Sequence, residues 1–413
     1  MWNYVPFEEA VEICDTQRKP INNKDRARRI EGKKKDSLYP YYGATGQVGY
    51  IDDYITDGEY VLLGEDGAPF LNTFAKKAYI ISGKTWVNNH AHVLKSKTNN
   101  KFLCYYLNYF NYSGYVSGTT RLKLTQGQMK HIKIPDVSIE EQNRIVSRIE
   151  ELFSELDKGV ETLQIIKKQL AVYRQAVLKD AFEGKWKYEQ RASISNSISF
   201  GEVNENEINK LAPIPSEWKY VYLSDLGELG RGKSKHRPRN DKRLFENGIY
   251  PFFQTGDVKS APNLLVDCKK KYGEFGLAQS KLWPAGTLCI TIAANIAETC
   301  FLGIEGCFPD SIVGFTPDER KVFKEYVRYF IEASKIRLWA YAPATAQKNI
   351  NLNTLENLIV PYCNIDEQRF IVAEINARLS LCDHIEQTVD TALSQAEAMR
   401  QSILKKAFEG GLN

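Results

Sequence analysis

The chain has 413 residues, of which 43% are hydrophobic and 12% aromatic, so it can build packed cores and is too long for a single one. Its 55 Lys and Arg residues against 51 Asp and Glu residues give a net charge of +4, which excludes a uniformly basic nucleic-acid-binding chain. No apolar run is long enough to span a membrane, the N-terminus has no signal-peptide pattern, and the eight cysteines form no C-x-x-C pair, so we expect a reduced, cytoplasmic protein.

Residues 1–138 have the mixed pattern of an α+β globular unit. Gly58–Leu63 is rich in the aromatic and aliphatic residues of a strand, and Lys101–Leu107 has the pattern of a helix. Between Arg18 and Lys35, Lys and Arg gather at a density that would neutralise DNA phosphates, although a solvated loop is the simpler interpretation of one such run. The predicted phosphate contacts are Arg18, Lys19, Lys24, Arg26, Arg28, Arg29, Lys33 and Lys34.

Three turns of this unit, Tyr42–Gln47, Gly64–Gly67 and Gly118–Lys123, carry polar side chains that can address the edges of bases. Glycine lets the backbone come close to a groove, and the carboxylates of Gly64–Gly67 can accept a hydrogen bond from cytosine. A polar turn is more often only a turn, so these three count for their positions in the chain. The predicted contacts are Tyr42, Thr45, Gln47, Thr119, Arg121 and Lys123.

Residues 139–184 are predicted to form one long helix. Ser138 and Glu141 have the spacing of a capping box, in which the serine oxygen caps a free N–H and the glutamate reaches back, and Gly184 is typical of a helix end. Apolar residues recur with heptad spacing, so the helix needs a partner helix. The predicted packing positions are Ile145, Ile149, Leu152, Leu156, Leu163, Ile166 and Leu170.

Residues 185–216 are rich in Ser, Asn and Glu and are predicted to be a linker, and residues 217–364 are predicted to form a second α+β unit. Gly286–Ile292 has a strand pattern and Glu325–Ile331 a helix pattern. A second basic segment begins at Arg231, and Phe253–Asp257 is the counterpart of the Tyr42–Gln47 turn. The predicted DNA contacts of this unit are Arg231, Lys233, Lys235, Arg237, Arg239, Thr255, Asp257, Gln347, Lys348 and Asn349.

Residues 365–413 are predicted to form a second long helix that repeats the first. Thr119–Gly184 aligns with Thr345–Gly410 without a gap, and 20 of the 66 aligned residues are identical, where unrelated sequences would share roughly 4. Asn364 and Glu367 take the places of the first capping box. The predicted packing positions are Ile371, Ile375, Ile385, Val389, Ala396 and Met399.

The simplest partner for each long helix is the other one. About 44 residues make a rod of roughly 66 Å, which the chain must retrace before the second helix begins, so we expect the pair to be antiparallel. The alternative is an intermolecular coiled coil. Because the basic segments recur at equivalent places in the two units, the sequence predicts a DNA-binding surface on each unit.

Two motifs suggest other chemistry but lack its context. Gly227–Ser234 matches the G-x-x-x-x-G-K-S of a phosphate loop, yet polar residues and Pro238 follow where a helix would have to begin. His90 and His92 can share one strand face, but no third metal ligand is evident. We therefore expect no catalytic residue and no metal in this chain.

With these features, the chain resembles the specificity subunit of type I restriction–modification systems (HsdS) over nearly its whole length. The motifs that carry the resemblance lie in both halves. They are the duplicated layout, Trp218-x-x-Val221-x-Leu223, the turn at Tyr39-Pro40 and its counterpart at Tyr250-Pro251, Ile139-x-Glu141-Gln142 with Ile365-x-Glu367-Gln368, and the Ala-Phe-Glu-Gly that ends each long helix.

The resemblance implies two target-recognition domains joined by two antiparallel helices, in a non-catalytic prokaryotic subunit. It implies double-stranded DNA, two methyltransferase (HsdM) subunits and restriction (HsdR) subunits as partners, and no membrane. It places S-adenosylmethionine, ATP and Mg²⁺ on the partners and no cofactor on this chain. Each domain is expected to read one half of an asymmetric split target while the helices set the spacing, about one DNA turn of 34–36 Å or a multiple of it. The methylated adenine would be flipped into a partner's pocket.

Two alternative functions stay open on the sequence. One is a P-loop-type DNA enzyme, which ATP binding that is lost in Lys233→Ala would favour. The other is a coiled-coil adaptor protein without direct DNA reading. DNA binding that is unchanged after neutralisation of Arg231, Lys233, Arg237 and Arg239 would favour the adaptor.

Overall fold

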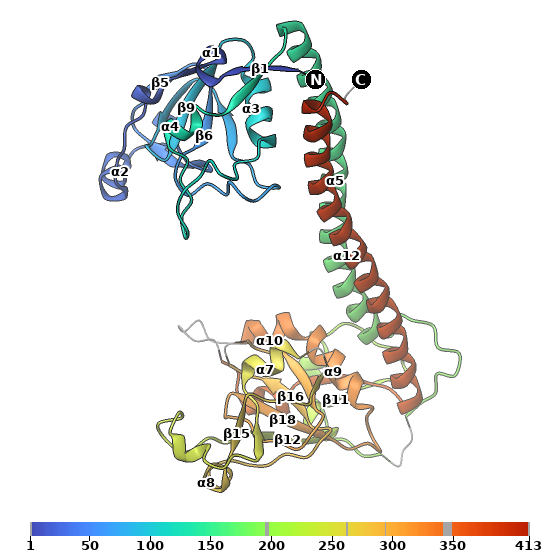
Figure 1. Cartoon of the computed structure of the whole chain (residues 1–413). Helices are drawn as coiled ribbons and strands as arrows, with labels where there is room; N and C mark the ends of the chain where they lie inside the picture. Colours follow the sequence, from blue (N-terminus) through green and yellow to red (C-terminus); the bar gives the residue numbers. More distant parts are fainter. Residues whose placement is uncertain (1, 195–197, 262, 294, 342–348, 412–413) are drawn as a thin grey trace. The chain divides into compact units, whose positions relative to one another are not determined.

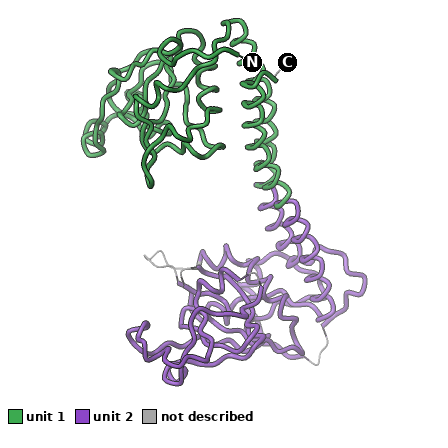
Figure 2. Tube along the Cα trace, in the orientation of Figure 1, with its two compact units in different colours: residues 1–167, 387–413 green, residues 168–386 purple. Residues whose placement is uncertain are grey.

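The computed structural model describes residues 2–194, 198–261, 263–293, 295–341 and 349–411 (Figure 1). The chain divides into two compact units, which Figure 2 colours separately: unit 1 comprises residues 1–167 and 387–413, and unit 2 comprises residues 168–386. Each long helix contributes to both units. The helix α5 (Ile139–Phe182) begins in unit 1 and ends in unit 2, whereas α12 (Ile365–Phe408) begins in unit 2 and ends in unit 1.

Unit 1 contains two four-stranded sheets, ordered β2-β9-β6-β7 and β4-β3-β8-β5, and a two-stranded ribbon, β1-β10. Helix α3 packs on the first sheet, and its Phe102, Leu103 and Leu107 join the buried core. The elements before the long helix are β1 (Asn3–Pro6), α1 (Phe7–Ala10), β2 (Val11–Ile13), η1 (Asp15–Gln17), α2 (Asn23–Ile30), η2 (Lys35–Ser37), β3 (Tyr39–Gly43), β4 (Gly46–Ile51), β5 (Thr56–Asp57), β6 (Tyr60–Gly64), β7 (Ala78–Ile81), β8 (Lys84–Val87), β9 (Ala91–Ser96), α3 (Asn100–Tyr109), α4 (Gln126–Met129) and β10 (Lys133–Asp136).

Unit 2 contains a five-stranded sheet, ordered β12-β18-β16-β17-β14, and two ribbons, β11-β19 and β13-β15. Its core includes Tyr326, Val327 and Phe330 of α9 against the sheet. The elements are α6 (Glu205–Ile208), β11 (Lys219–Tyr222), η3 (Leu223–Asp225), β12 (Gly227–Arg231), η4 (Lys242–Leu244), β13 (Tyr250–Phe252), α7 (Thr255–Ser260), β14 (Leu264–Leu265), β15 (Lys270–Tyr272), α8 (Glu274–Ala278), β16 (Leu288–Thr291), β17 (Thr299–Leu302), β18 (Ile312–Pro317), α9 (Lys324–Ala333), α10 (Lys335–Tyr341), α11 (Leu352–Glu356) and β19 (Ile359–Tyr362).

The predicted strands and helices of the two units are confirmed at β6, β16, α3 and α9. The two units also repeat the register of their terminal ribbons. Tyr4 of β1 lies opposite Pro135 of β10, and Tyr220 of β11 lies opposite Pro361 of β19. This ribbon leads directly into the long helix in each copy, so both helices start from the same local frame.

The two long helices pack antiparallel within the chain, as predicted. In unit 1, Ile145 and Ile149 of α5 share a buried core with Ile403 and Leu404 of α12. In unit 2, Val177 and Leu178 of α5 share a core with Ile371 and Ile375 of α12. The start of each helix therefore meets the end of the other, and the partner of each helix lies in the same chain.

One interhelix ion pair recurs in the two units. Arg400 pairs with Asp157 in unit 1, and Arg174 pairs with Asp383 at 2.7 Å in unit 2. Both pairs join residues that correspond in the repeat, because each number in the second copy exceeds its counterpart by 226 (400 − 174 and 383 − 157).

Most of the predicted packing positions lie in the interface between the helices, and one does not. Ile145, Ile149, Leu170, Ile371, Ile375, Val389 and Ala396 are buried, and Leu152, Leu156, Leu163, Ile166 and Ile385 are partly buried. The prediction is wrong for Met399, which is 54% exposed, like its counterpart Tyr173 at 43%. An α-helix drifts by about 20° per heptad from the ideal 3.5-residue repeat, so a strict heptad pattern misplaces positions far along the helix.

The ends of the helices are confirmed as predicted. Gly184 and Gly410 have φ of 65° and 82°, the left-handed conformation in which glycine closes a helix. Just before them, Phe182 and Phe408 are buried in the cores of units 2 and 1. The end of each long helix is thus part of a globular core rather than a free rod.

The helix starts confirm only half of the predicted capping box. Ser138 Oγ accepts from the Glu141 N–H at 3.3 Å, and Asn364 Oδ1 accepts from the Glu367 N–H at 2.9 Å. The glutamates have other partners: Glu141 binds Arg144, and Glu367 accepts from Arg191 Nε at 2.7 Å and from Trp218 Nε1 at 3.1 Å. A charged partner within reach competes with the backbone N–H for the glutamate. The expected hydrogen bond from each glutamate back to the N–H of the capping residue is therefore wrong.

The glutamine that follows fixes each helix start to its unit. Gln142 Nε2 donates to the Val137 carbonyl and Gln368 Nε2 to the Cys363 carbonyl, both at 2.8 Å. Both glutamines are buried, so these bonds lie in a dry environment where a lost partner is costly. No helix in the described part of the chain is long and apolar enough to cross a lipid bilayer.

Candidate nucleic-acid interface

The first basic segment contains a helix held by ion pairs, so the simpler interpretation of this run as a solvated loop is wrong for α2. Arg29 Nε lies 2.6 Å from Asp52 Oδ1, and the Arg29 guanidinium lies over the Trp86 ring at 5.0 Å. Lys33 Nζ lies 2.7 Å from the other Asp52 oxygen, and Lys33 and Arg29 together hold the pKa of Asp52 below its usual range against a small effect of burial. These contacts attach α2 to the second sheet of unit 1.

Arg18 and Arg26 also have partners within unit 1. Arg18 is 19% exposed and pairs with Asp15 and Glu65, and Arg26 donates to the Val48 carbonyl at 3.1 Å. Both arginines therefore help to hold the fold of unit 1, and their contact with DNA phosphates stays a prediction. The exposed cations of the segment are Lys19, Lys24, Arg28, Lys33, Lys34 and Lys35, of which Lys33 is paired with Asp52.

The three predicted turns of unit 1 come together on one surface. The Ala44 carbonyl of the β3–β4 turn lies 3.0 Å from where a Cβ at Gly64 would be. The Gly67 N–H donates to the Leu122 carbonyl at 2.9 Å, and the Leu124 N–H donates to the Glu65 carbonyl at 2.8 Å. Segments that are far apart in the sequence, residues 42–47, 64–67 and 117–124, are therefore neighbours.

This surface presents both uncharged and basic side chains. Thr45, Gln47 and Thr119 are exposed, whereas Tyr42 is partly buried beside the Tyr79 ring, and burial raises its pKa. Arg121 Nε lies 2.7 Å from Asp66, and Lys123 Nζ lies 3.5 Å from Glu65, with the side chains of Arg121 and Lys123 58% and 49% exposed. The carboxylates of the 64–67 turn pair with these cations, and a hydrogen bond from cytosine to them stays a prediction.

His92 lies behind this surface, fully buried on β9. Its Nδ1 is 2.8 Å from Asp15 Oδ2, and its Nε2 is 3.0 Å from the Leu124 carbonyl oxygen. Burial acts to raise the pKa of Asp15, but hydrogen bonds from His92 and the Val93 N–H, together with the charge of Arg18, outweigh burial and lower it. Both ring nitrogens are engaged, and the described residues contain no group of three potential metal ligands.

The second basic segment is a strand followed by a loop. Gly227–Arg231 forms the edge strand β12, antiparallel to β18, and no helix begins at Lys233 or Ser234 in this described segment. A phosphate loop needs a helix N-terminus at that point. The match to the G-x-x-x-x-G-K-S motif therefore has no structural counterpart.

Some cations of this segment are held by ion pairs or backbone carbonyls, and others make no such contact among the described residues. Arg231 donates to the Asp310 carbonyl, Arg239 pairs with the Asp310 carboxylate at 2.7 Å, and Arg237 donates to the Ser234 carbonyl. Arg243 and His236 bind Asp241 and hold its pKa well below the usual range. Lys233 and Lys235 are the remaining predicted contacts: Lys235 is exposed on the loop, and the Lys233 N–H donates to the Phe308 carbonyl at 3.1 Å.

The predicted turn at Phe253–Asp257 is wrong in form, because Thr255 begins helix α7. Asp257 Oδ2 accepts from the Gln254 N–H at 2.7 Å and closes a capping box. A carboxylate three residues into a helix satisfies an orphan backbone donor, and this local bond was missed. Gln347 and Lys348 lie outside the described residues, while Asn349 is exposed beside Ala293.

A basic groove of unit 2 was missed at the sequence level. It is lined by Asn240, Lys242, Arg243, Phe245, Glu246, Gly248, Cys268, Lys269, Lys270 and Lys271. Strand β15 brings Lys270 and Lys271 beside β13, next to the 231–243 segment. The run of three lysines at 269–271 was the available signal, but it lies far in sequence from the first basic run.

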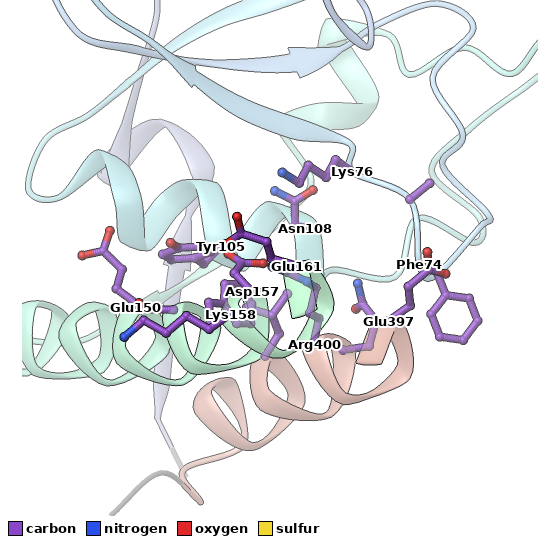
Figure 3. Close-up of a pocket in the computed structure, with 15 residues that line it drawn as sticks. Phe74, Lys76, Tyr105, Asn108, Glu150, Asp157, Lys158, Glu161, Glu397 and Arg400 are labelled. Carbon is purple, nitrogen blue, oxygen red and sulfur yellow. Dashed lines mark hydrogen bonds and ion pairs between the residues drawn. The ribbon is translucent and has the colours of Figure 1, made fainter. Parts of the chain in front are cut away.

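A second kind of surface lies in unit 1 between α3 and the two long helices (Figure 3). Its floor includes Tyr105 and Phe153, whose rings meet edge to face at 5.7 Å, and Phe74 at its rim is 55% exposed. Burial, followed by the charge of Glu150, raises the pKa of Tyr105 to about 12. Four carboxylates line the groove, those of Glu150, Asp157, Glu161 and Glu397, with Lys76, Lys158 and Arg400.

Comparison with known proteins shows which family has this sequence and architecture. A family model for the type I restriction modification DNA specificity domain matches residues 2–167 and 215–394. The chain is 27% identical over 410 residues to the putative type I restriction enzyme specificity subunit S.HindORF215P of Haemophilus influenzae, covering 95% of this chain and 91% of that protein. It is 26% identical to the type I restriction enzyme EcoDI specificity subunit of Escherichia coli, covering 91% of this chain and 83% of that protein.

Solved structures share the fold at low sequence identity. One comes from work on the complex assembly and conformational transition of the type I R-M system. It matches with a TM-score of 0.71 at 17% sequence identity, and the match covers 100% of this chain and 98% of that chain. The HsdS subunit from Thermoanaerobacter tengcongensis matches with a TM-score of 0.56 at 17% identity, over 100% of this chain and 97% of its own. These likenesses and the two units confirm the predicted α+β fold with paired long helices and an internal repeat. Because the family model matches most of the sequence, the chain belongs to the type I restriction modification DNA specificity family, as a non-catalytic specificity subunit.

Proposed function

We propose that each unit reads one half of an asymmetric, split target in double-stranded DNA, and that the helix pair sets the spacing and docks two methyltransferase subunits. The observation that carries this proposal is a repeated frame with different exposed faces. The ribbons share their register and the helix ends pack alike, whereas the polar surfaces have different residues. A repeated frame with divergent surfaces is suited to two different half-sites at one fixed separation.

The exposed cations support contact with the DNA backbone. Lys19, Lys24, Arg28 and Lys34 in unit 1 and Lys235 in unit 2 lie on their surfaces, and the groove at Lys269–Lys271 adds further charge. Contacts to phosphates position a protein on the duplex, and contacts to base edges specify the sequence. For base contact we propose the exposed Thr45, Gln47, Thr119 and Asn349.

Two equivalent apolar residues support two docking places for methyltransferase subunits. Tyr173 and Met399 occupy the same position of the repeated helix and are 43% and 54% exposed. In unit 1, Phe74 beside the acidic groove adds a further exposed ring. Exposed apolar side chains beside charged groups are typical of protein interfaces. The partners would bring S-adenosylmethionine for adenine methylation, and restriction subunits would bring ATP and Mg²⁺.

The first test is a methylation map of the source genome with and without this gene, by single-molecule sequencing. We expect one split, asymmetric adenine-methylation motif to disappear with the gene. An unchanged map in cells that produce the complex would contradict the proposal. Returning the gene with Phe253–Tyr362 replaced by the matching segment of a relative should change one half of the motif and leave the other half intact.

The second test separates DNA reading from an adaptor role. In Lys269→Gln/Lys270→Gln, the slope of log K for DNA against log salt should fall by about 1.8, because each lost phosphate contact removes roughly 0.9. Lys187→Gln is the matched control, because Lys187 is 88% exposed but lies on the segment before unit 2's ribbon. Unchanged binding in the double variant would favour the coiled-coil adaptor.

A further inference from the structure

The hydrogen bonds of His92 tie two parts of unit 1 together. Asp15 Oδ2 faces Nδ1 at 2.8 Å, and the Leu124 carbonyl oxygen faces Nε2 at 3.0 Å. A carbonyl oxygen can only accept, and so can an ionised carboxylate, so the ring lies between two acceptors. His92 makes this bridge in a fully buried position.

Further charged groups surround this pair on each packed element. Glu65, which follows β6, lies 3.8 Å from His92 Nδ1 and is itself bound by Arg18 and by Lys123 of the 117–124 loop. Gln126 Nε2 donates to Asp15 Oδ2 at 3.0 Å. The two carboxylates thus hold His92 and Arg18 beneath the surface, while Lys123 contacts Glu65 from outside.

The fold of a recognition unit does not need a buried histidine at this place. In unit 1, His92 lies opposite Leu63 of β6, and in unit 2 the same place in the sheet, opposite Ile290 of β16, is taken by Val313. Val313 is fully buried in the apolar core. A buried polar side chain is costly unless its hydrogen bonds are made, so a role besides packing accounts for the presence of His92.

That role lies in the loop it holds. Leu124, whose carbonyl receives the Nε2 hydrogen, ends the 117–124 loop that carries Arg121 and Lys123. We propose that His92 is a positioning residue for DNA recognition by unit 1: its buried ring bridges Asp15 and the Leu124 carbonyl and locks this loop so that Arg121 and Lys123 meet DNA together. The inference rests on the proposed function and assigns a residue that does not itself touch DNA.

The experiment measures DNA binding by the complex of this chain with its methyltransferase subunits, over a salt series, on a duplex carrying the mapped target. His92→Gln leaves one amide nitrogen and one amide oxygen against the two acceptors, so either Asp15 or the Leu124 carbonyl loses its partner. We expect about tenfold weaker binding, the order of one buried hydrogen bond lost, and a smaller salt slope. Arg121→Gln/Lys123→Gln should weaken wild-type binding but have little further effect on His92→Gln, because coupled residues are not additive.

The double variant His92→Gln/Asp15→Asn is the rescue. The side-chain amide introduced at position 15 can donate to the side-chain oxygen introduced at position 92, and the new amide nitrogen at position 92 can donate to the Leu124 carbonyl. The hydrogen bonds from position 15 to the Leu124 carbonyl are then restored, the exposed Gln126 can turn its amide oxygen to accept from position 15, and Arg18 keeps its pair with Glu65. We expect the double variant to regain most of the lost affinity. Val313→Ala, in the equivalent place of unit 2, is the control and should leave the Arg121 and Lys123 contributions intact.

Three results would overturn the inference. The first is unchanged binding by His92→Gln, and the second is a loss that adds in full to that of Arg121→Gln/Lys123→Gln. The third is a rescue variant that stays weak although hydrogen exchange shows unit 1 folded. If the wild-type complex itself has no salt-dependent DNA binding, the proposed function fails as well, and that result is distinct from the other three.

Discussion

Phe182 and Phe408 end the two long helices, and they meet equivalent rings in the two units. Phe182 packs edge to face with Tyr326 and Phe330 at 5.0 and 5.2 Å, and Phe408 does so with Phe102 and Tyr106 at 5.4 and 5.3 Å. The faces that these anchors support differ, as His92 and Val313 illustrate. The repeat therefore preserves the joints between helix and unit, and the surfaces above them vary.

If the contacts between each helix end and its unit are equivalent, truncating either phenylalanine should lower the free energy of unfolding of its unit by the same amount. Phe182→Ala and Phe408→Ala each remove a buried ring, for about 3–5 kcal/mol, in unit 2 and unit 1 respectively. Hydrogen exchange resolved by peptide measures each unit separately, because a chain with two cores need not unfold in one step. Val172→Ala is the control, since Val172 is 71% exposed. A large loss in one unit with none in the other would break the equivalence.

Substitution of the glutamates at the two helix starts should destabilise the two units to different extents. Glu367 is 1% exposed in its side chain and binds Arg191 and Trp218. Glu367→Gln leaves the partly buried guanidinium of Arg191 without its charge partner and should lower the free energy of unfolding of unit 2 by about 3 kcal/mol. Glu141 binds Arg144 at the surface, so Glu141→Gln should cost unit 1 less than about 1 kcal/mol. Chemical denaturation followed at each unit compares them. Equal losses would mean that the linker contact at Arg191 adds nothing.

Acid should weaken unit 1 through Asp15. The pKa of Asp15 is lower in the folded protein than the unfolded value of about 4. Its contribution to the stability of unit 1 is therefore fully present above the unfolded pKa and is lost as the pH falls through the folded pKa. We expect wild-type unit 1 to lose more stability than Asp15→Asn between about pH 5 and pH 2, as followed by hydrogen exchange or near-ultraviolet circular dichroism. Parallel acid curves for the two proteins would contradict the lowered pKa.

The interhelix ion pairs should have the smallest effect. Arg400 and Asp157 have side chains 30% and 61% exposed, and Arg174 and Asp383 26% and 70%, so each pair is largely open to solvent. Arg400→Met and Arg174→Met should each cost less than about 1 kcal/mol, and less still at high salt. A loss of several kcal/mol in thermal unfolding would show that these pairs, rather than the apolar interface, hold the helices together.

Local signals in the sequence predicted the repeated frame well. Ser138 and Asn364 cap their helices, Gly184 and Gly410 close them, and the heptad pattern places most of the interface. These features depend on neighbours within one or two turns of helix, which a sequence displays directly. Met399 marks the limit, because helix drift accumulates over many residues.

The candidate site could not be predicted from the sequence because ion pairs join residues that are far apart in the chain. The sequence shows Arg18, Arg29 and Arg239 as members of basic runs, but their partners Glu65, Asp52 and Asp310 lie tens of residues away. Charge density alone cannot tell a cation that holds the fold from one that meets DNA. The groove at Lys269–Lys271 was missed for the same reason, because only the β13–β15 ribbon joins it to the first basic run.

The division of the chain into units also sets an order of events during synthesis. Unit 2 is made of continuous sequence, residues 168–386, whereas unit 1 needs residues 387–413 to complete its core. Until that last segment leaves the ribosome, Phe102, Tyr106 and Tyr109 lack the Phe408 ring that they pack against. Domains generally fold as their segments emerge, so the part of the protein that is made first is the part that is finished last.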